Sequence, residues 1–188
     1  MAELDVDQIR WTSADTDLMP DDGTRYEVVE GELFMTRAPD FRHQDVCGAI
    51  YFELTAWSRM SGLGQAILGP GVVFDEYSAV IPDVVWISSE RLANSVDAAG
   101  HLTGAPELVV EVLSAGGENE RRDREAKLKL YSLRGVQEYW IADWRLRQIE
   151  TYRRERGQLR LQGTLFTNDE LTSPLLAGFA CLGARLFG

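Results

Sequence analysis

The sequence contains few of the residues that build disulfide frameworks or zinc sites. Only two cysteines and two histidines occur among its 188 residues. Cys47 and Cys181 lie far apart and form no metal-type spacing, and His43 and His101 have no ligand partner at a useful spacing. A disulfide is possible, but in a reducing compartment we expect two free, buried thiols.

Long apolar runs are also missing. No stretch approaches the roughly 18 apolar residues that a transmembrane helix needs. Residues 1–7 are acidic and lack the basic segment and the apolar segment of a secretory signal. We therefore expect a cytoplasmic protein that does not associate with a membrane.

Basic side chains are in the minority. The chain carries 19 Lys and Arg against 30 Asp and Glu, a net charge of −11, which argues against simple electrostatic affinity for nucleic acid. The distribution is uneven, because residues 1–60 hold 13 acids and 5 bases whereas residues 121–160 hold 6 acids and 12 bases. The basic segment either faces a polyanion or solubilises an exposed helix and hairpin, and charge alone leaves both open.

The remaining composition is that of an ordinary globular domain, with 45% hydrophobic and 26% charged residues. We find no internal repeat. At this length one core is expected, so we divide the chain into an N-terminal extension, residues 1–24, and a single domain, residues 25–188.

Hydrophobic periodicity and turn residues predict an alternation of strands and helices. The order predicts an α/β fold with a mixed central sheet flanked by helices and with β-hairpins near both ends. The expected elements are a hairpin at 25–35, a helix at 41–60, strands at 65–68, 72–75, 81–87 and 108–113, a helix at 118–134, a strand at 136–143, a hairpin at 148–161 and a short strand at 164–166.

Two carboxylates stand in apolar surroundings. Asp83 opens the run Val84–Ile87, and Glu111 lies inside the run Leu108–Leu113. Burying an ionised carboxylate is costly unless it is paired or binds a metal. If the two strands pair, both carboxylates converge at one edge of the sheet, where they can hold Mg²⁺ with the carbonyl of Val112 as a further ligand.

A lysine near such a pair would stabilise charge on a phosphate or orient the attacking water. In many sites of this type the lysine follows the second acid by two residues, but that position is Leu113 here. The expected helix supplies Lys127 and Lys129, which lie on different faces, so only one can reach the site. Each residue also has a structural interpretation: Asp83 as a strand-start residue, Glu111 in a salt bridge and Lys127 as a solvated lysine.

Other chemistries find less support. Ser114 has no evident base beside it, which argues against a serine nucleophile. No glycine-rich phosphate loop of standard spacing is present, and the glycines at 116–117 belong to an ordinary loop. The pattern as a whole therefore favours a metal-dependent reaction at a phosphate ester.

Several short motifs occur in an order that resembles the Uma2 family, a family of proposed endonucleases with the PD-(D/E)XK restriction-endonuclease-like fold. The resemblance covers roughly residues 25–153. The motifs are Tyr26–Leu33, His43-Gln44, Pro82–Val85, Pro106–Ser114, Asp123-Arg124 with Lys127 and Tyr131, and Gly135–Ile141.

This resemblance implies phosphodiester hydrolysis that depends on Mg²⁺ or Mn²⁺. Asp83 would be the first acid, Glu111 the second, and Lys127 would replace the lysine absent at position 113. Glu32 and His43 would flank the site, with Lys129 as a further accessory candidate.

The leading hypothesis is an endonuclease acting on DNA as a homodimer. Arg121, Arg122 and Arg124 would contact the phosphate backbone without base specificity. The alternative is a catalytically inactive nuclease-like fold that serves as a dimeric binding or regulatory module, a hypothesis that the charge of −11 favours.

Overall fold

A six-stranded mixed sheet forms the centre of the computed structural model, which describes residues 10–187. Its order is β10-β9-β8-β7-β6-β3, and β7 and β8 run parallel while every other neighbouring pair is antiparallel. The strands are β3 (Gly64–Leu68), β6 (Val84–Ser88), β7 (Leu108–Val112), β8 (Glu138–Asp143), β9 (Gln148–Glu155) and β10 (Gln158–Phe166). The predicted mixed sheet is confirmed.

A smaller sheet packs beside it, in the order β2-β1-β5-β4. Its strands are β1 (Arg25–Val29), β2 (Glu32–Thr36), β4 (Val72–Asp75) and β5 (Ser78–Val80). The tight turn between β1 and β2 places Glu30 and Gly31 at φ 53° and 87°, as a two-residue hairpin loop requires. Near the C-terminus, β11 (Glu170–Thr172) and β12 (Ala180–Leu182) form a separate pair, followed by the 3₁₀ turn η2 (Gly183–Arg185).

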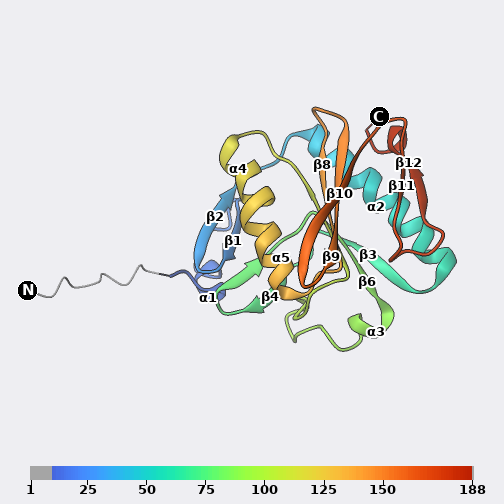
Figure 1. Cartoon of the computed structure of the whole chain (residues 1–188). Coiled ribbons are helices and arrows are strands. Elements are labelled where there is room, and N and C mark those ends of the chain that lie inside the picture. The colour runs from blue at the N-terminus through green and yellow to red at the C-terminus, as the bar shows by residue number, and fades with distance from the viewer. Residues whose placement is uncertain (1–9, 188) are drawn as a thin grey trace, which may run out of the picture.

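Helices cover both faces of the central sheet (Figure 1). The long helix α2 (Phe41–Ser61) covers one face, and Gly62 ends it at φ 68°. On the other face lies a continuous helical segment, α4 (Gly117–Arg121), η1 (Arg122–Lys127) and α5 (Leu128–Arg134), between the β1–β2 hairpin and the central sheet. Two short helices, α1 (Ser13–Thr16) and α3 (Ser89–Leu92), complete the fold. None of the helices in residues 10–187 is long and apolar enough to cross a bilayer.

Strand β7 is buried on both faces, as its sequence predicts. Leu108, Val110 and Val112 belong to the core under α2. Val109 and Leu113 belong to the core shared with α5 and the small sheet. Because strand side chains alternate, Glu111 lies on this second face, between two apolar neighbours.

The structure corrects three predicted elements. The predicted strand at 81–87 begins only at Val84, because Pro82, which lacks an N–H, separates it from β5. The predicted strand at 164–166 is the end of β10, which bulges between Leu161 and Gly163. The predicted helix at 118–134 contains the π-helical segment η1. The part of the predicted N-terminal extension before Arg10 lies outside the described residues.

Two glycines give a test of packing at the edge of the sheet. A Cβ at Gly64 would lie 2.3 Å from the carbonyl oxygen of Ile87 and 2.8 Å from Cα of Ser88, whereas a Cβ at Gly48 on α2 would meet nothing within 4 Å. We expect Gly64→Ala to lower the free energy of unfolding by about 2 kcal/mol and Gly48→Ala to raise it by about 0.5–1 kcal/mol. Urea denaturation measures both, and equal effects of the two substitutions would contradict this packing.

Candidate active site

Strand pairing brings the two predicted carboxylates together. In the antiparallel β6–β7 pair Val84 lies opposite Val110. One residue further along the same register, Asp83 comes opposite Glu111. Asp83 Oδ2 accepts a hydrogen bond of 2.9 Å from the backbone N–H of Val112. Both carboxylates are buried, with 6% of Asp83 and 2% of Glu111 exposed.

Lys127, the last residue of the helical segment η1, brings a positive charge to these carboxylates. Its Nζ lies 2.8 Å from Glu111 Oε1 and 2.8 Å from Glu27 Oε1, and only 1% of the residue is exposed. Burial alone would lower the pKa of Lys127, but the carboxylates of Glu111 and Glu27 outweigh it and raise that pKa above its usual value. The ammonium group is therefore permanently charged and fixed between two strands.

The π-helical segment explains how the helix presents several charged groups at once. A π-helix brings residues five positions apart onto one face, here Arg122 and Lys127. Arg122 donates to Asp123 Oδ1 at 3.0 Å and to Thr36 Oγ1 at 2.6 Å. Asp123 in turn lies 3.8 Å from Lys127 Nζ. Such π-bulges are frequent at functional sites.

The two oxygens of Glu111 have different surroundings. Oε1 accepts from Lys127 and, at 2.9 Å, from the hydroxyl of Tyr131. Oε2 receives no hydrogen bond from any described residue. Burial raises the pKa of Glu111 to about 8, even though Lys127 acts in the opposite direction. This carboxyl group therefore loses its proton at a higher pH than an exposed glutamate does.

Asp83 has the opposite tendency. Burial would raise its pKa, but hydrogen bonds and charges from His43, the Val112 N–H and Lys127 outweigh burial and lower it. His43 Nε2 lies 3.3 Å from Oδ2, and a guanidinium nitrogen of Arg25 lies 3.1 Å from Oδ1. Two neighbouring carboxyl groups whose pKa values diverge can take different roles in one reaction.

The charge balance of this cluster depends on His43. With every acid ionised, four carboxylates face three cations from lysine and arginine. The members are Glu27, Asp83, Glu111 and Asp123 against Arg25, Arg122 and Lys127. A proton on His43 or on Glu111, or a bound cation, would compensate the fourth carboxylate.

A narrow cleft of about 20 Å³, partly open to solvent, gives access to the cluster. Asp83, Glu111, Val112 and Lys127 all line it, as does His43. Asp40 caps α2 by accepting a hydrogen bond from the backbone N–H of Arg42. His43, in the first turn of this helix, faces Asp83. The structure thus brings together the residues predicted as acids, metal ligands and lysine.

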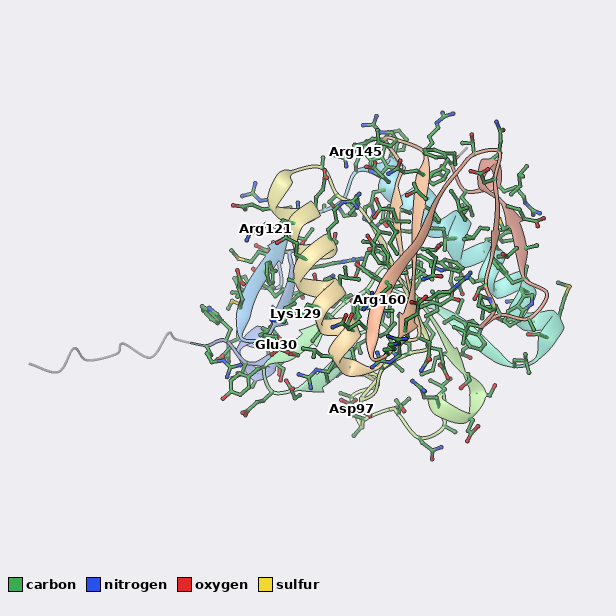
Figure 2. The ribbon with its side chains drawn as sticks, in the orientation of Figure 1. Glu30, Asp97, Arg121, Lys129, Arg145 and Arg160 are labelled. Carbon is green, nitrogen blue, oxygen red and sulfur yellow. The ribbon has the colours of Figure 1, made fainter. Side chains whose placement is uncertain are left out.

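The other predicted residues lie apart from this cleft or are already paired. Glu32, Lys129 and Arg121 line a different cleft on the outer side of α4–α5, and Figure 2 labels Arg121 and Lys129 along that helical segment. Arg121 pairs with Glu125, and Arg124 pairs with Glu150. Arg122, predicted to contact a phosphate backbone, is instead buried within the acidic cluster.

The sequence analysis missed Glu27 and the surroundings of Cys47. Glu27 is 3% exposed and accepts from Lys127 and from the backbone N–H of Ile81. Its signal was the same as for Glu111, an acid inside an apolar strand. Cys47 is free and buried as expected, and burial raises the pKa of its thiol. His43, Cys47 and Asp83 also offer donor atoms within 4.8 Å of one another, a grouping that could hold a metal ion.

The two lysines of the chain allow a matched test of the cluster. Lys127→Met leaves the carboxylates of Glu27 and Glu111 buried without their common partner, so we expect a loss of about 3–5 kcal/mol in the free energy of unfolding. Lys129→Met removes an exposed charge and should change it by less than about 0.5 kcal/mol. Similar midpoints of urea denaturation for the two variants would contradict a structural role for Lys127.

Comparison with known proteins agrees with this architecture. A crystal structure described as a putative nuclease belonging to DUF820 from Anabaena variabilis superposes with a TM-score of 0.75 at 16% identity, covering 94% of this chain and 97% of that one. The type IIG restriction endonuclease BpuSI gives a TM-score of 0.43 at 12% identity, over 81% of this chain and 17% of that one. No curated protein matches the chain.

The first of these likenesses shows a shared nuclease-type fold. At the level of sequence, residues 14–184 match the model of the family Uma2, whose description is "Putative restriction endonuclease". The match extends over nearly the whole chain and includes every residue of the acidic cluster. The predicted resemblance is therefore confirmed, and the chain belongs to the Uma2 family.

Proposed function

We propose that this protein is a metal-dependent nuclease that hydrolyses phosphodiester bonds in DNA. One observation carries the proposal: Asp83 and Glu111 meet across paired strands, with the ammonium group of Lys127 2.8 Å from Glu111, and all three line one cleft. Two carboxylates and a lysine are suited to a divalent cation and a phosphate ester.

The donor set fits Mg²⁺ or Mn²⁺. Glu111 Oε2 receives no hydrogen bond from the described residues, and Asp83 is held in its ionised form. The four carboxylates of the cluster favour a cation, and the carbonyl of Val112 stays a predicted further ligand. The side chain of Arg25, which contacts Asp83 Oδ1, is 35% exposed and would have to shift to admit an ion at this oxygen. A bound divalent ion would supply Lewis acidity and lower the pKa of water.

The protein side chains then have separate tasks. Lys127 orients the attacking water and offsets charge on the phosphate. Glu27 and Tyr131 hold Lys127 and Glu111 in place through hydrogen-bonding contacts of 2.8 and 2.9 Å. His43 fixes the orientation of Asp83. Because these partners are buried, the geometry is preorganised before substrate enters.

DNA is the proposed substrate because the family description names a restriction endonuclease. The alternative hypothesis of an inactive binding or regulatory module is not favoured by this family membership or by the intact set of two acids and a lysine. A homodimer and a cytoplasmic location remain predictions from the sequence.

Cleavage of DNA tests the proposal directly. We expect the native protein to cut plasmid or oligonucleotide DNA with Mn²⁺ or Mg²⁺ and not with chelator. Asp83→Asn and Glu111→Gln should each lower the rate by about 100-fold or more, because each removes a carboxylate from the cation site. Asp45→Asn, an exposed acid two residues from His43, is the control and should retain the native rate. Equal rates in all variants would indicate a contaminating nuclease.

Metal binding should release a proton. At pH 7, below the pKa of about 8 for Glu111, the carboxyl group is protonated, and a divalent ion must displace that proton. We therefore expect Mn²⁺ affinity to rise with pH up to about 8 and to level off above it. Calorimetry at pH 7 in two buffers of different ionisation enthalpy should show close to one proton released, falling towards zero by pH 9. Absence of release at pH 7 would mean that Glu111 is already ionised.

A further inference from the structure

Most cations near the proposed site are already neutralised by carboxylates of the same chain. Arg25 contacts Asp83, Arg122 contacts Asp123, and Lys127 bridges Glu27 and Glu111. The arginines expected to face DNA on the outside of the helix, Arg121 and Arg124, are also paired. A polyanion needs positive charge that is not already committed in this way.

Arg37 is the exception among the cations that line the cleft. It lies in the loop between β2 and α2, its side chain is exposed, and no carboxylate of the described residues lies within 4.0 Å of it. Its guanidinium also makes no hydrogen bond within residues 10–187. The side chain therefore stands at the mouth of the cleft with all its donors available.

The same loop lies between two neighbouring clefts, which together we call the groove. The cleft over Asp83 and Glu111 and its neighbour share five lining residues. These shared residues are Thr36, Arg37, Pro39, His43 and Ser114. The neighbouring cleft continues past Ala115 to Asn119 and Trp144. Arg37 thus lies where the two clefts meet.

Trp144, at the far end of this groove, is held by two contacts. Trp144 donates its indole N–H to the carbonyl of Leu113 at 3.1 Å, and the guanidinium of Arg42 stacks over its ring at 4.3 Å. Asp40 holds Arg42 through two hydrogen bonds of 3.0 and 2.8 Å. Trp144 itself lines the groove, and an aromatic ring offers a stacking surface to a base.

We propose that Arg37 is the principal phosphate-binding cation of this protein, and that one strand of the nucleic acid follows the groove from Asp83 past Arg37 toward Trp144. This inference rests on the proposed function. Arg37 would bind the phosphate next to the one that is cleaved, because it lies at the rim of the cleft rather than among the reacting groups. The planar guanidinium suits two parallel hydrogen bonds to phosphate oxygens.

Fluorescence anisotropy with a labelled single-stranded oligonucleotide and its duplex tests this path, with Ca²⁺ replacing Mg²⁺ to limit cleavage. We expect Arg37→Gln to weaken binding by about tenfold, the effect of one charge-assisted contact. The slope of log K against log salt should fall in magnitude by about 0.7–0.9, as for one lost phosphate contact. Arg37→Lys should restore part of the affinity.

Arg160 provides the matched control. It is exposed on β10, has no carboxylate partner among the described residues and does not line the groove, and Figure 2 labels it there. Arg160→Gln removes the same charge and should leave both affinity and salt slope unchanged. Equal losses in the two variants would indicate a general charge effect and would overturn the assignment to Arg37.

The remaining outcomes separate this inference from the function itself. If the native protein binds and cleaves DNA and Arg37→Gln binds equally well, the assignment of Arg37 is wrong while the nuclease function stands. If the native protein neither binds nor cleaves DNA in Mn²⁺, the proposed function fails and the inference fails with it. The midpoint of thermal unfolding of Arg37→Gln should equal that of the native protein. An equal midpoint shows that a loss of binding is not caused by a loss of fold.

Discussion

The ammonium group of Lys127, shared between Glu27 and Glu111, is the contact on which the rest of the structure depends. Glu27 belongs to the small sheet, Glu111 to the central strand β7, and Lys127 to the helical segment between them. A single buried charge thus joins three layers. Removing any partner would leave uncompensated charge in a medium that solvates charge poorly. The groups that would act on a phosphate are therefore also groups that hold the sheets together.

This double role has an electrostatic consequence. Burial is deepest around Glu111, and it raises the pKa of that carboxyl group to about 8. Asp83, with His43 and a backbone N–H beside it, moves in the other direction. The surroundings of each carboxyl group are enough to move the pKa values of two neighbouring acids apart. The fold thus favours the ionised form of Asp83 and the protonated form of Glu111.

Local patterns in the sequence predicted much of this architecture. The helix from Phe41 and the doubly covered strand around Glu111 follow from apolar periodicity, and an acid inside such a strand identifies itself by its cost of burial. The π-helical segment was not predicted because its local sequence is that of an ordinary helix, whereas its buried residues Arg122 and Lys127 pair with Glu27 on another element. The ion pairs could not be predicted from local sequence either, since Arg124 pairs with Glu150 on a strand 26 residues away. The sequence shows which residues are charged, but only the fold shows which of them form ion pairs.

That cancellation changes how an acidic protein can act on a polyanion. With a net charge of −11, long-range attraction to DNA is absent, and salt bridges within the chain neutralise most arginines near the cleft. Under the proposed function, productive contact would come from positive charge concentrated at short range, in a cation held by Asp83 and Glu111 and in unpaired side chains at the rim. Such a protein would bind nucleic acid weakly except where the metal, the groove and the strand meet. Its negative surface would thereby restrict cleavage to strands that enter the groove, since contacts elsewhere are repelled.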